Sequence, residues 1–159
     1  MGSRSNTDLA YIAGFLDGDG SLMLQIKKRN DGKRKLRFMS TICLYQDTRH
    51  EETLFWMQKL LKIGYISRRN DGISELRING FSQVQNILLK LMPFIRFKKN
   101  QAKALLKATR LLSQKSIIKL TDSNLRSLVD LIVTIQSNNY VSRSKRNQEE
   151  LLSILDLTP

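Results

Sequence analysis

Two aspartates separated by one glycine are the side chains in this sequence best suited to chemistry. They lie in the run Asp17-Gly18-Asp19-Gly20-Ser21, within a chain that has 14 acidic residues against 27 lysines and arginines. Three interpretations are open: a tight turn capped by the aspartates, the start of an EF-hand calcium loop, or a site for a hard divalent cation such as Mg²⁺. The EF-hand is excluded because its twelfth position requires glutamate, and Lys28 stands there. A magnesium site needs only one aspartate per chain if a second chain supplies another.

The composition excludes several other kinds of site. The chain has 159 residues and one cysteine, Cys43, so an internal disulfide framework cannot form. It also has one histidine, His50, which excludes a zinc site built from Cys and His within one chain. No apolar run approaches the roughly 20 residues that span a bilayer, and no signal peptide is recognisable. We therefore expect an intracellular protein that is not associated with a membrane.

The basic residues form three clusters. The formal net charge is +13 and the pI is about 10.2. Residues 76–121 hold ten lysines and arginines and no acidic residue, and residues 27–37 hold seven with only Asp31 against them. Arg143, Lys145 and Arg146 form the third cluster. A single charge run is most simply a solvated face. Three clusters of positive charge with almost no balancing acidic residues repel one another, and a bound phosphate backbone would reduce this repulsion. Nucleic acid is therefore the expected partner.

The two aspartates stand at the end of a predicted helix. Residues 6–8, Asn-Thr-Asp, are typical of a helix N-cap and predict a helix over residues 9–17. One face of this helix is apolar. The other face carries small side chains that would let a second helix approach closely, and it consists of Ala10, Ala13, Gly14 and Asp17.

Two hairpins and further helices follow. Alternating apolar residues predict strands over residues 21–29 and 36–44 around Asn30-Asp31-Gly32, and over residues 65–69 and 73–78 around Asn70-Asp71-Gly72. The order α-ββ-α-ββ-α predicts an α+β fold with one four-stranded antiparallel sheet and helices on one face. We expect a single domain over residues 1–159, with a disordered leader (1–6), this core (7–113) and C-terminal helices (121–157). Helical patterns after the first helix cover residues 51–61, 82–91, 99–112, 122–136 and 150–155.

The run Ile12-Ala13-Gly14-Phe15-Leu16-Asp17-Gly18-Asp19-Gly20 resembles the LAGLIDADG motif, and the flanking Tyr11 and Ser21 also fit. Residues 68–78 and Pro93-Phe94-Ile95-Arg96-Phe97-Lys98-Lys99-Asn100-Gln101-Ala102 are similar to parts of the single-motif, intron-encoded homing endonucleases of this family. The order of elements agrees with that family over nearly the whole chain. The resemblance implies the LAGLIDADG homing-endonuclease fold, in which a saddle-shaped four-stranded antiparallel sheet binds DNA.

The resemblance also assigns roles to individual residues. Asp19 corresponds to the acidic metal ligand of the family, and the carbonyl oxygen of Gly18 can bind the same ion. Gln46 corresponds to a polar residue that orients water, and Lys98 to a basic residue that stabilises negative charge. The implied cofactor is Mg²⁺, with Mn²⁺ able to replace it and Ca²⁺ supporting binding without cleavage. A further basic position has two candidates, Arg49 and His50.

The resemblance implies that two copies of the chain act together. The motif occurs once here, and single-motif members of the family are homodimers whose motif helices pack against each other. The small-residue stripe gives this packing a physical basis, since small side chains let two backbones come close. The dimer interface is therefore assigned to Ala10, Ala13, Gly14 and Asp17.

Double-stranded DNA is the implied partner, with the polar and cationic face of the sheet in its major groove. On that face either Arg68 or Arg69 is expected to point outward, and we assign the contact to Arg68. Phosphate contacts are expected from the C-terminal loop, at Ser142, Arg143 and Lys145. The remaining DNA contacts are expected from residues on the exposed sheet face or at the hairpin tips: Gln25, Lys27, Arg29, Arg37, Arg68, Asn70, Glu75 and Arg77.

The expected function is a site-specific endonuclease that cleaves both strands of a long, near-palindromic DNA site and leaves 3′ overhangs. Two alternatives stay open: an RNA-binding intron maturase, and a catalytically inactive DNA-binding regulator of the same fold. The presence of Asp19, Gln46 and Lys98 together favours cleavage. The resemblance implies the product of an organellar or prokaryotic intron.

Overall fold

The order of elements agrees with the predicted α-ββ-α-ββ-α pattern. The computed structural model describes residues 5–139 and 145–158. No helix in these two ranges is long and apolar enough to cross a membrane. The helices and strands are α1 (Asn6–Asp19), β1 (Gly20–Lys28), β2 (Leu36–Asp47), α2 (Glu52–Leu61), β3 (Tyr65–Arg68), β4 (Ile73–Asn79), α3 (Phe81–Leu91), α4 (Lys99–Gln114), α5 (Asp122–Asn138) and α6 (Gln148–Ile154).

The four strands form one antiparallel sheet in the order β1-β2-β4-β3. The hairpins β1–β2 and β3–β4 are joined through the long central pairing of β2 with β4. Gly20 pairs with Leu44, and Tyr65 pairs with Arg77. Because side chains alternate between the two faces of a strand, this register decides which residues face the helices and which face outward.

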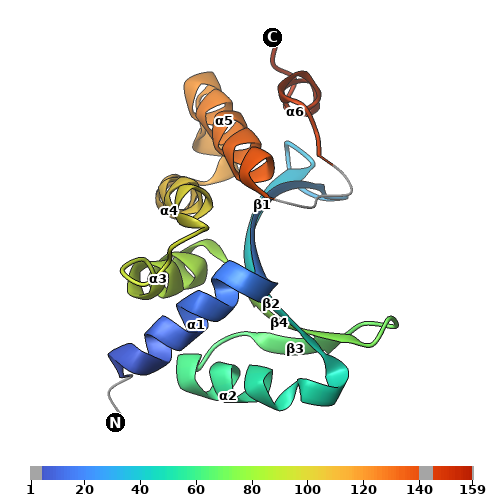
Figure 1. Cartoon of the computed structure of the whole chain (residues 1–159). Coiled ribbons are helices and arrows are strands. Elements are labelled where there is room, and N and C mark those ends of the chain that lie inside the picture. Colours follow the sequence, from blue (N-terminus) through green and yellow to red (C-terminus); the bar gives the residue numbers. More distant parts are fainter. Residues whose placement is uncertain (1–4, 140–144, 159) are drawn as a thin grey trace.

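The helices α1, α3, α4 and α5 lie on one side of the sheet (Figure 1). Between them and the strands lies the hydrophobic core, to which β1 contributes Leu22, Leu24 and Ile26. The α4 helix buries a wide apolar stripe and exposes lysines on its opposite side, which follows from apolar residues recurring with helical spacing. The opposite face of the sheet is left uncovered by these helices.

The helix α1 begins earlier and is turned differently than the sequence pattern predicts. Ser5 is the N-cap, with its side chain accepting from the N–H of Asp8, so the predicted cap at residues 6–8 is wrong by one position or more. Ala13 and Asp17 are buried inside the chain, so the predicted small-residue stripe does not form one exposed face. The exposed positions of this helix are Asn6, Thr7, Tyr11, Gly14, Gly18 and Asp19.

The first residue of β1 has to be glycine because helix and strand meet there at close range. A Cβ atom on Gly20 would lie 2.8 Å from the Cα atom and 2.8 Å from the carbonyl oxygen of Leu16. Gly20→Ala is therefore expected to lower the free energy of unfolding by about 1–3 kcal/mol, as overpacking does. Urea unfolding measures the change. Gly18→Ala is the matched control, because nothing lies within 4 Å of a Cβ atom there; equal losses in both variants would contradict the explanation.

Both hairpin tips contain the same short ion pair. Arg29 donates from Nη2 to Asp31 at 2.9 Å, and Arg69 donates from Nη2 to Asp71 at 2.6 Å. The repeated Arg-Asn-Asp-Gly run in the sequence therefore builds two similar tips in one sheet. In both tips a guanidinium is paired with a carboxylate two residues further along the chain.

Candidate active site and nucleic-acid interface

Asp19 is the last residue of α1, and its carboxylate is free. The side chain is exposed, and it has no hydrogen-bond or ion-pair partner among the residues that the structure describes. Since β1 begins at the next residue, Asp19 stands where the chain enters the sheet beside β2. A carboxylate held at such a junction without an intramolecular partner is able to bind a cation.

Asp17 lies on the buried side of the same helix, and both of its carboxylate oxygens accept hydrogen bonds. Its Oδ2 atom accepts a hydrogen bond from the backbone N–H of Arg96 at 2.7 Å, and its Oδ1 atom accepts one from the N–H of Lys98 at 3.0 Å. Only 6% of the residue is exposed. The two aspartates of the motif therefore differ in their contacts: Asp17 joins α1 to the loop before α4, whereas Asp19 is exposed and has no hydrogen-bond or ion-pair partner among the described residues.

The loop before α4 brings Lys98 to this end of α1. Lys98 is 5% exposed, and its Nζ atom donates to the backbone carbonyl of Asp17 at 2.6 Å. The last carbonyls of a helix lack intrahelical donors and carry the negative end of its dipole. The α1 helix has no basic residue in its last turn, so Lys98 supplies the cation there. Burial lowers the pKa of the Lys98 ammonium, and the carboxylates of Asp17 and Asp19 oppose that shift.

Gln46 lies in β2, two residues beyond the partner of Gly20. Its side chain is half-buried, and its Oε1 atom accepts from the backbone N–H of Asp47 at 2.8 Å. Among the described residues, its amide N–H groups have no partner. Strand register therefore places a free amide donor near the junction of α1 and β1.

The two candidates for the further basic position follow in a short 3-10 helix, Thr48–His50. Arg49 is paired with Asp47, with Nη2 and Oδ2 2.8 Å apart, and this guanidinium holds the pKa of Asp47 well below its usual range. His50 is exposed and has no hydrogen-bond or ion-pair partner within the described ranges of the chain. Of the two side chains, His50 is the one left free for a substrate.

The available ligands suit a hard cation that is held mainly by substrate and water. In residues 5–139 and 145–158, no group of three or more His, Cys, Asp or Glu side chains could hold a metal ion. Each chain offers the carboxylate of Asp19 and the carbonyl oxygen of Gly18. Mg²⁺ is commonly bound through one or two carboxylates together with waters and substrate phosphates. The donor set therefore fits Mg²⁺ and lacks the additional ligands of a closed structural site.

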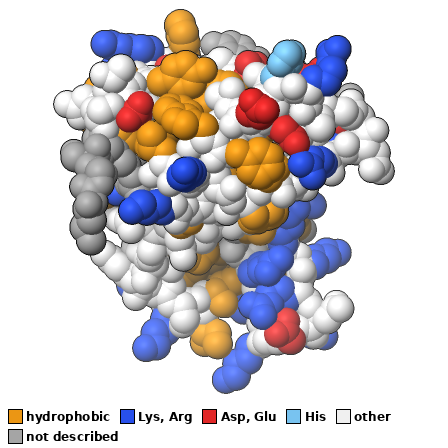
Figure 2. All heavy atoms as spheres, turned by 90° about the horizontal axis from the view of Figure 1, so that it is seen from below, with side chains coloured by type: hydrophobic (Ala, Val, Ile, Leu, Met, Phe, Trp, Pro, Cys, Tyr) orange, Lys and Arg blue, Asp and Glu red, His pale blue; other side chains and the backbone are white. Residues whose placement is uncertain are grey.

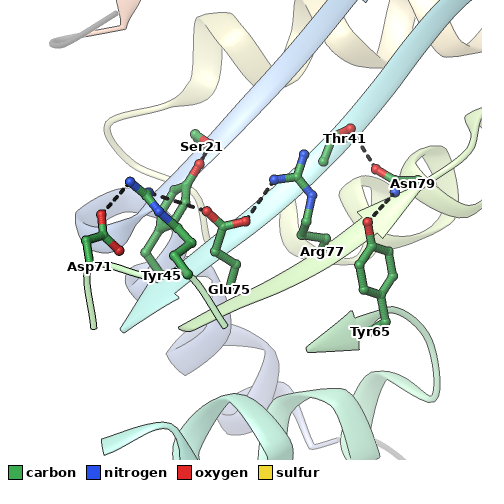
Figure 3. A network of polar contacts seen from close by, with 9 residues as sticks. Ser21, Thr41, Tyr45, Tyr65, Asp71, Glu75, Arg77 and Asn79 are labelled. Carbon is green, nitrogen blue, oxygen red and sulfur yellow. Dashed lines mark hydrogen bonds and ion pairs between the residues drawn. The ribbon is translucent and has the colours of Figure 1, made fainter. Parts of the chain in front are cut away.

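A network of polar side chains covers the sheet face opposite the helices (Figure 3). At its centre is Glu75 of β4, which is 7% exposed. Its carboxylate accepts from Nη1 of Arg77 at 2.8 Å and from Nη1 of Arg69 at 3.4 Å. Burial works against the charge on Arg77, but the hydrogen bond with Glu75 helps to raise the pKa of its guanidinium above the ordinary value. Since each guanidinium has five N–H donors, both retain donors for another acceptor.

Further hydrogen bonds extend this network along the strands. The hydroxyl groups of Ser21 and Tyr45 are 2.9 Å apart. Thr41 donates to Oδ1 of Asn79 at 2.7 Å, and Nδ2 of Asn79 donates to the hydroxyl group of Tyr65 at 3.3 Å (Figure 3). Donors and acceptors on this face are therefore held in defined positions, which a surface that recognises base edges requires.

A different surface lies where α1 meets α2. Tyr11 and Trp56 are 54% and 40% exposed, and their rings make an edge-to-face contact with centroids 5.6 Å apart. Together with Thr7, Asp8 and residues 52–53 they line an open groove. Hydrophobic side chains gather on this side of the molecule, with basic ones beside them (Figure 2). Such a patch indicates an interaction surface, and the sequence pattern did not predict it.

A family model described as LAGLIDADG endonuclease matches residues 12–107. The chain belongs to the LAGLIDADG endonuclease family. The matched segment starts at the first residue of the motif and ends in α4, so it includes Asp19, Gln46 and Lys98. The fold expected from the family resemblance is thereby confirmed.

Two relatives are named as DNA endonucleases. I-CvuI of Chlorella vulgaris is 37% identical over 97 residues, which span 61% of this chain and only 60% of that protein. I-CreI of Chlamydomonas reinhardtii is 27% identical over 157 residues, which span 98% of this chain and 94% of that protein. A crystal structure of I-CvuI contains the I-CreI target DNA, uncleaved in the presence of Mg. It matches this chain with a TM-score of 0.83 at 28% identity, and the match covers 94% of this chain and 93% of the I-CvuI chain.

The LAGLIDADG fold also occurs as part of a longer chain. I-SmaMI, a LAGLIDADG homing endonuclease solved with cleaved DNA, matches 93% of this chain over 47% of its own length, with a TM-score of 0.74. The identity is 20%, so this comparison establishes the fold alone. One copy of the present chain has the architecture of one half of I-SmaMI.

In this LAGLIDADG protein, most of the side chains expected to contact DNA lie on the exposed sheet face or at its tips. Arg29 and Asn70 lie at hairpin tips, and Lys145 is exposed, with Nζ donating to the carbonyl of Asn139. Ser142 and Arg143 lie outside the described residues. The strand positions that register assigns to the exposed face are Gln25, Lys27, Arg37, Glu75 and Arg77.

The placement of Arg68 on that face is wrong. Arg68 pairs with Ser74 in the sheet, so its side chain shares a face with Ser74 and not with Glu75. Its guanidinium binds Glu51 at the start of α2, with Nη2 and Oε1 2.6 Å apart. Arg69 stands one position later and reaches Glu75 instead. The strict two-residue period of a strand, counted from Tyr65, could have identified Arg69.

Cys43 is expected to be unreactive in the folded protein. It lies fully buried in β2, and burial raises the pKa of its thiol from 9.0 to about 11. The thiolate is the nucleophile, and a shift of two pKa units leaves about a hundredfold less of it at a given pH below 9. Because the chain has one cysteine, iodoacetamide labelling at pH ~8 should be at least about a hundredfold slower in native than in urea-unfolded protein.

The same shift makes the stability of the fold depend on pH. The folded-state pKa lies above the unfolded value, so the contribution of Cys43 is complete below about pH 9 and is lost as the pH rises towards about 11. Unfolding midpoints measured across this range check the sign. Rapid labelling of the native protein at pH ~8 would contradict the burial of Cys43.

Proposed function

We propose that this chain is a site-specific DNA endonuclease that acts as a homodimer and uses a divalent metal ion, Mg²⁺ in the cell, to hydrolyse phosphodiester bonds. The observation that carries the proposal is the meeting of a free carboxylate, Asp19, with a buried ammonium group, Lys98, at one end of the motif helix. Family membership supports it. The names of I-CvuI and I-CreI give the reaction class.

Each residue of this site has a chemical role in the proposed reaction. Asp19 and the carbonyl oxygen of Gly18 would hold the metal ion, which when bound polarises the scissile phosphate and lowers the pKa of the attacking water. The ammonium group of Lys98 has three donors, and one is used by the carbonyl of Asp17. The other two can stabilise the negative charge that develops on the phosphate. The free amide of Gln46 can orient a water molecule.

Two copies of the chain are needed for cleavage of both strands, because one copy supplies one Asp19. The exposed side of α1 is suited to self-association, since Gly14 lets a second backbone approach and Tyr11 offers an aromatic surface. The correspondence of this fold to half of I-SmaMI supports the same arrangement. A two-fold arrangement of identical chains predicts a DNA site with near-palindromic halves.

Recognition of that site is assigned to the sheet face around Glu75. Arg69 and Arg77 present ordered donors there, and arginine commonly reads guanine through its O6 and N7 atoms. The hairpin tips add arginines that are paired with aspartates in the free protein. The basic surface as a whole supplies the salt-dependent attraction to phosphate.

The proposal is tested by incubating the protein with a large pool of genomic or randomised duplex DNA and sequencing every new end. Reactions with Mg²⁺, Mn²⁺, Ca²⁺ and EDTA are compared, and the mass in solution is measured by sedimentation. We expect staggered ends at one near-palindromic site with Mg²⁺ or Mn²⁺, binding without cleavage with Ca²⁺, and a mass of twice 18.4 kDa.

Each other outcome contradicts a defined part of the proposal. Selective binding of one duplex without ends in any metal would indicate a regulator of the same fold. Preference for a folded intron RNA without DNA ends would indicate a maturase. Cleavage by a monomer would leave the reaction in place and refute the shared active site.

A further inference from the structure

We infer that Asp17 is a positioning residue of the active site: its carboxylate holds the backbone of Arg96 and Lys98 so that the Lys98 ammonium group stays at the end of α1. The inference rests on the proposed function, because it concerns the reaction assigned to Asp19 and Lys98. It replaces the sequence-based assignment of Asp17 to the dimer interface, which its burial contradicts.

The contacts of Asp17 form a closed link between two distant segments. Oδ2 and Oδ1 accept the N–H groups of Arg96 and Lys98, at 2.7 and 3.0 Å. In return, Nζ of Lys98 donates to the carbonyl oxygen of Asp17 at 2.6 Å. The same residue thus holds both the backbone and the side chain of Lys98. A side chain held at both ends cannot leave this place without breaking buried hydrogen bonds, each of which is costly to lose.

The segment held by Asp17 has separate anchors on either side. Before it, the N–H groups of Phe94 and Ile95 bond to the carbonyl of Leu91, and the side chain of Ile95 is fully buried. After it, α4 begins at Lys99, and Lys98 is its N-cap residue without a side-chain cap. Asp17 therefore acts on the three-residue stretch from Arg96 to Lys98 that decides where the ammonium group lies, and not on the packing of α3 or α4.

A carboxylate is required for this link. Both of its oxygens accept, one from each N–H group. In Asp17→Asn, one oxygen is replaced by an NH₂ group, which is a donor and would face a donor. The variant keeps the size of the side chain and loses one of the two bonds, so it loosens the position of Lys98 while leaving the aliphatic core unchanged.

The experiment is a double-mutant cycle on the target duplex with Asp17→Asn, Lys98→Ala and the double variant, measured in single-turnover cleavage with Mg²⁺. We expect Asp17→Asn to lower the cleavage rate about ten- to a hundredfold. The dissociation constant for the uncleaved duplex in Ca²⁺ should change less than about threefold, because the recognition face is untouched. In the Lys98→Ala background the same replacement should cost less than about twofold, since the group that it positions is already absent.

A purely structural role would give a different pattern. Equal losses of rate in both backgrounds, or an unchanged rate in Asp17→Asn, would overturn the inference. A shift of Asp17→Asn from dimer to monomer in sedimentation would also overturn it and restore the interface role. Asp122→Asn, the same chemical change on the exposed surface of α5, is the control for loss of an acidic group. If the wild-type protein cuts no DNA, the proposed function fails, and the inference fails with it because it assigns Asp17 a role in that reaction.

A measurement on the wild-type protein covers the case in which Asp17→Asn does not fold. Amide hydrogen exchange should show the N–H groups of Arg96 and Lys98 protected to the same degree as those in the middle of α1. Exchange at the rate of an open loop would overturn the inference without any variant.

Discussion

Asp19→Asn should abolish cleavage and leave DNA binding intact. The amide removes the only carboxylate of the described residues that stands free at the end of α1. A metal ion contributes several kcal/mol to the stabilisation of the transition state, and about 1.4 kcal/mol is tenfold in rate. We expect single-turnover cleavage with Mg²⁺ to fall at least about a thousandfold. Binding to the uncleaved duplex should be equal or tighter, since a negative charge near phosphate is removed.

The matched control for this prediction is Asp122→Asn, which removes an exposed acidic group from the first turn of α5. It should cut at the wild-type rate. If Asp19→Asn folds, as judged by its unfolding midpoint, but no longer binds the duplex, Asp19 is not chiefly catalytic. If it cuts normally, the metal site lies elsewhere.

Lys98→Ala should slow cleavage by about a hundred- to a thousandfold, the loss typical of removing one preorganised donor from a developing negative charge. The side chain lies at the end of α1, away from the exposed sheet face, so the choice of target should not change. Sequencing the ends that the variant produces at long incubation times measures both quantities.

Lys103→Ala is the control for loss of one positive charge, because Lys103 is exposed on the outer side of α4. Its cleavage rate should equal that of the wild type at moderate salt. An altered site preference in Lys98→Ala would overturn the role assigned to Lys98, since it would make this residue part of recognition.

The sequence was sufficient to predict the order of elements and the pairing of the hairpins. Alternating apolar residues and the Asn-Asp-Gly turns marked the strands, and register then followed from the turns. The ends of elements were less accurate. The α1 helix starts at Asn6 after a Ser5 cap, and α4 runs to Gln114, because capping and packing of the last turn depend on contacts that the pattern does not contain.

For the site, the family resemblance pointed to Asp19 and Lys98, which lie at the same end of α1, but not to the contacts of Asp17. The partners of Asp17 are backbone N–H groups 79 and 81 positions away, and backbone groups leave no signature in residue types. The choice between Arg68 and Arg69 failed for a related reason. Neighbouring residues in a strand point to opposite faces, so an error of one position in the register moves a guanidinium from the exposed face to the helix side.

The sharing of Glu75 by two arginines has a consequence for how a target sequence can change. Arg69 and Arg77 both donate to this one carboxylate, so replacing either alters the orientation of the other. Substitutions in contact are non-additive, and preferences at the corresponding base positions are therefore expected to show epistasis. In a homodimer each substitution also acts on both half-sites. If the target sequence changes in evolution, Glu75, Arg69 and Arg77 therefore have to change together. A variant in which only one of them is replaced has the disturbed contact in both half-sites.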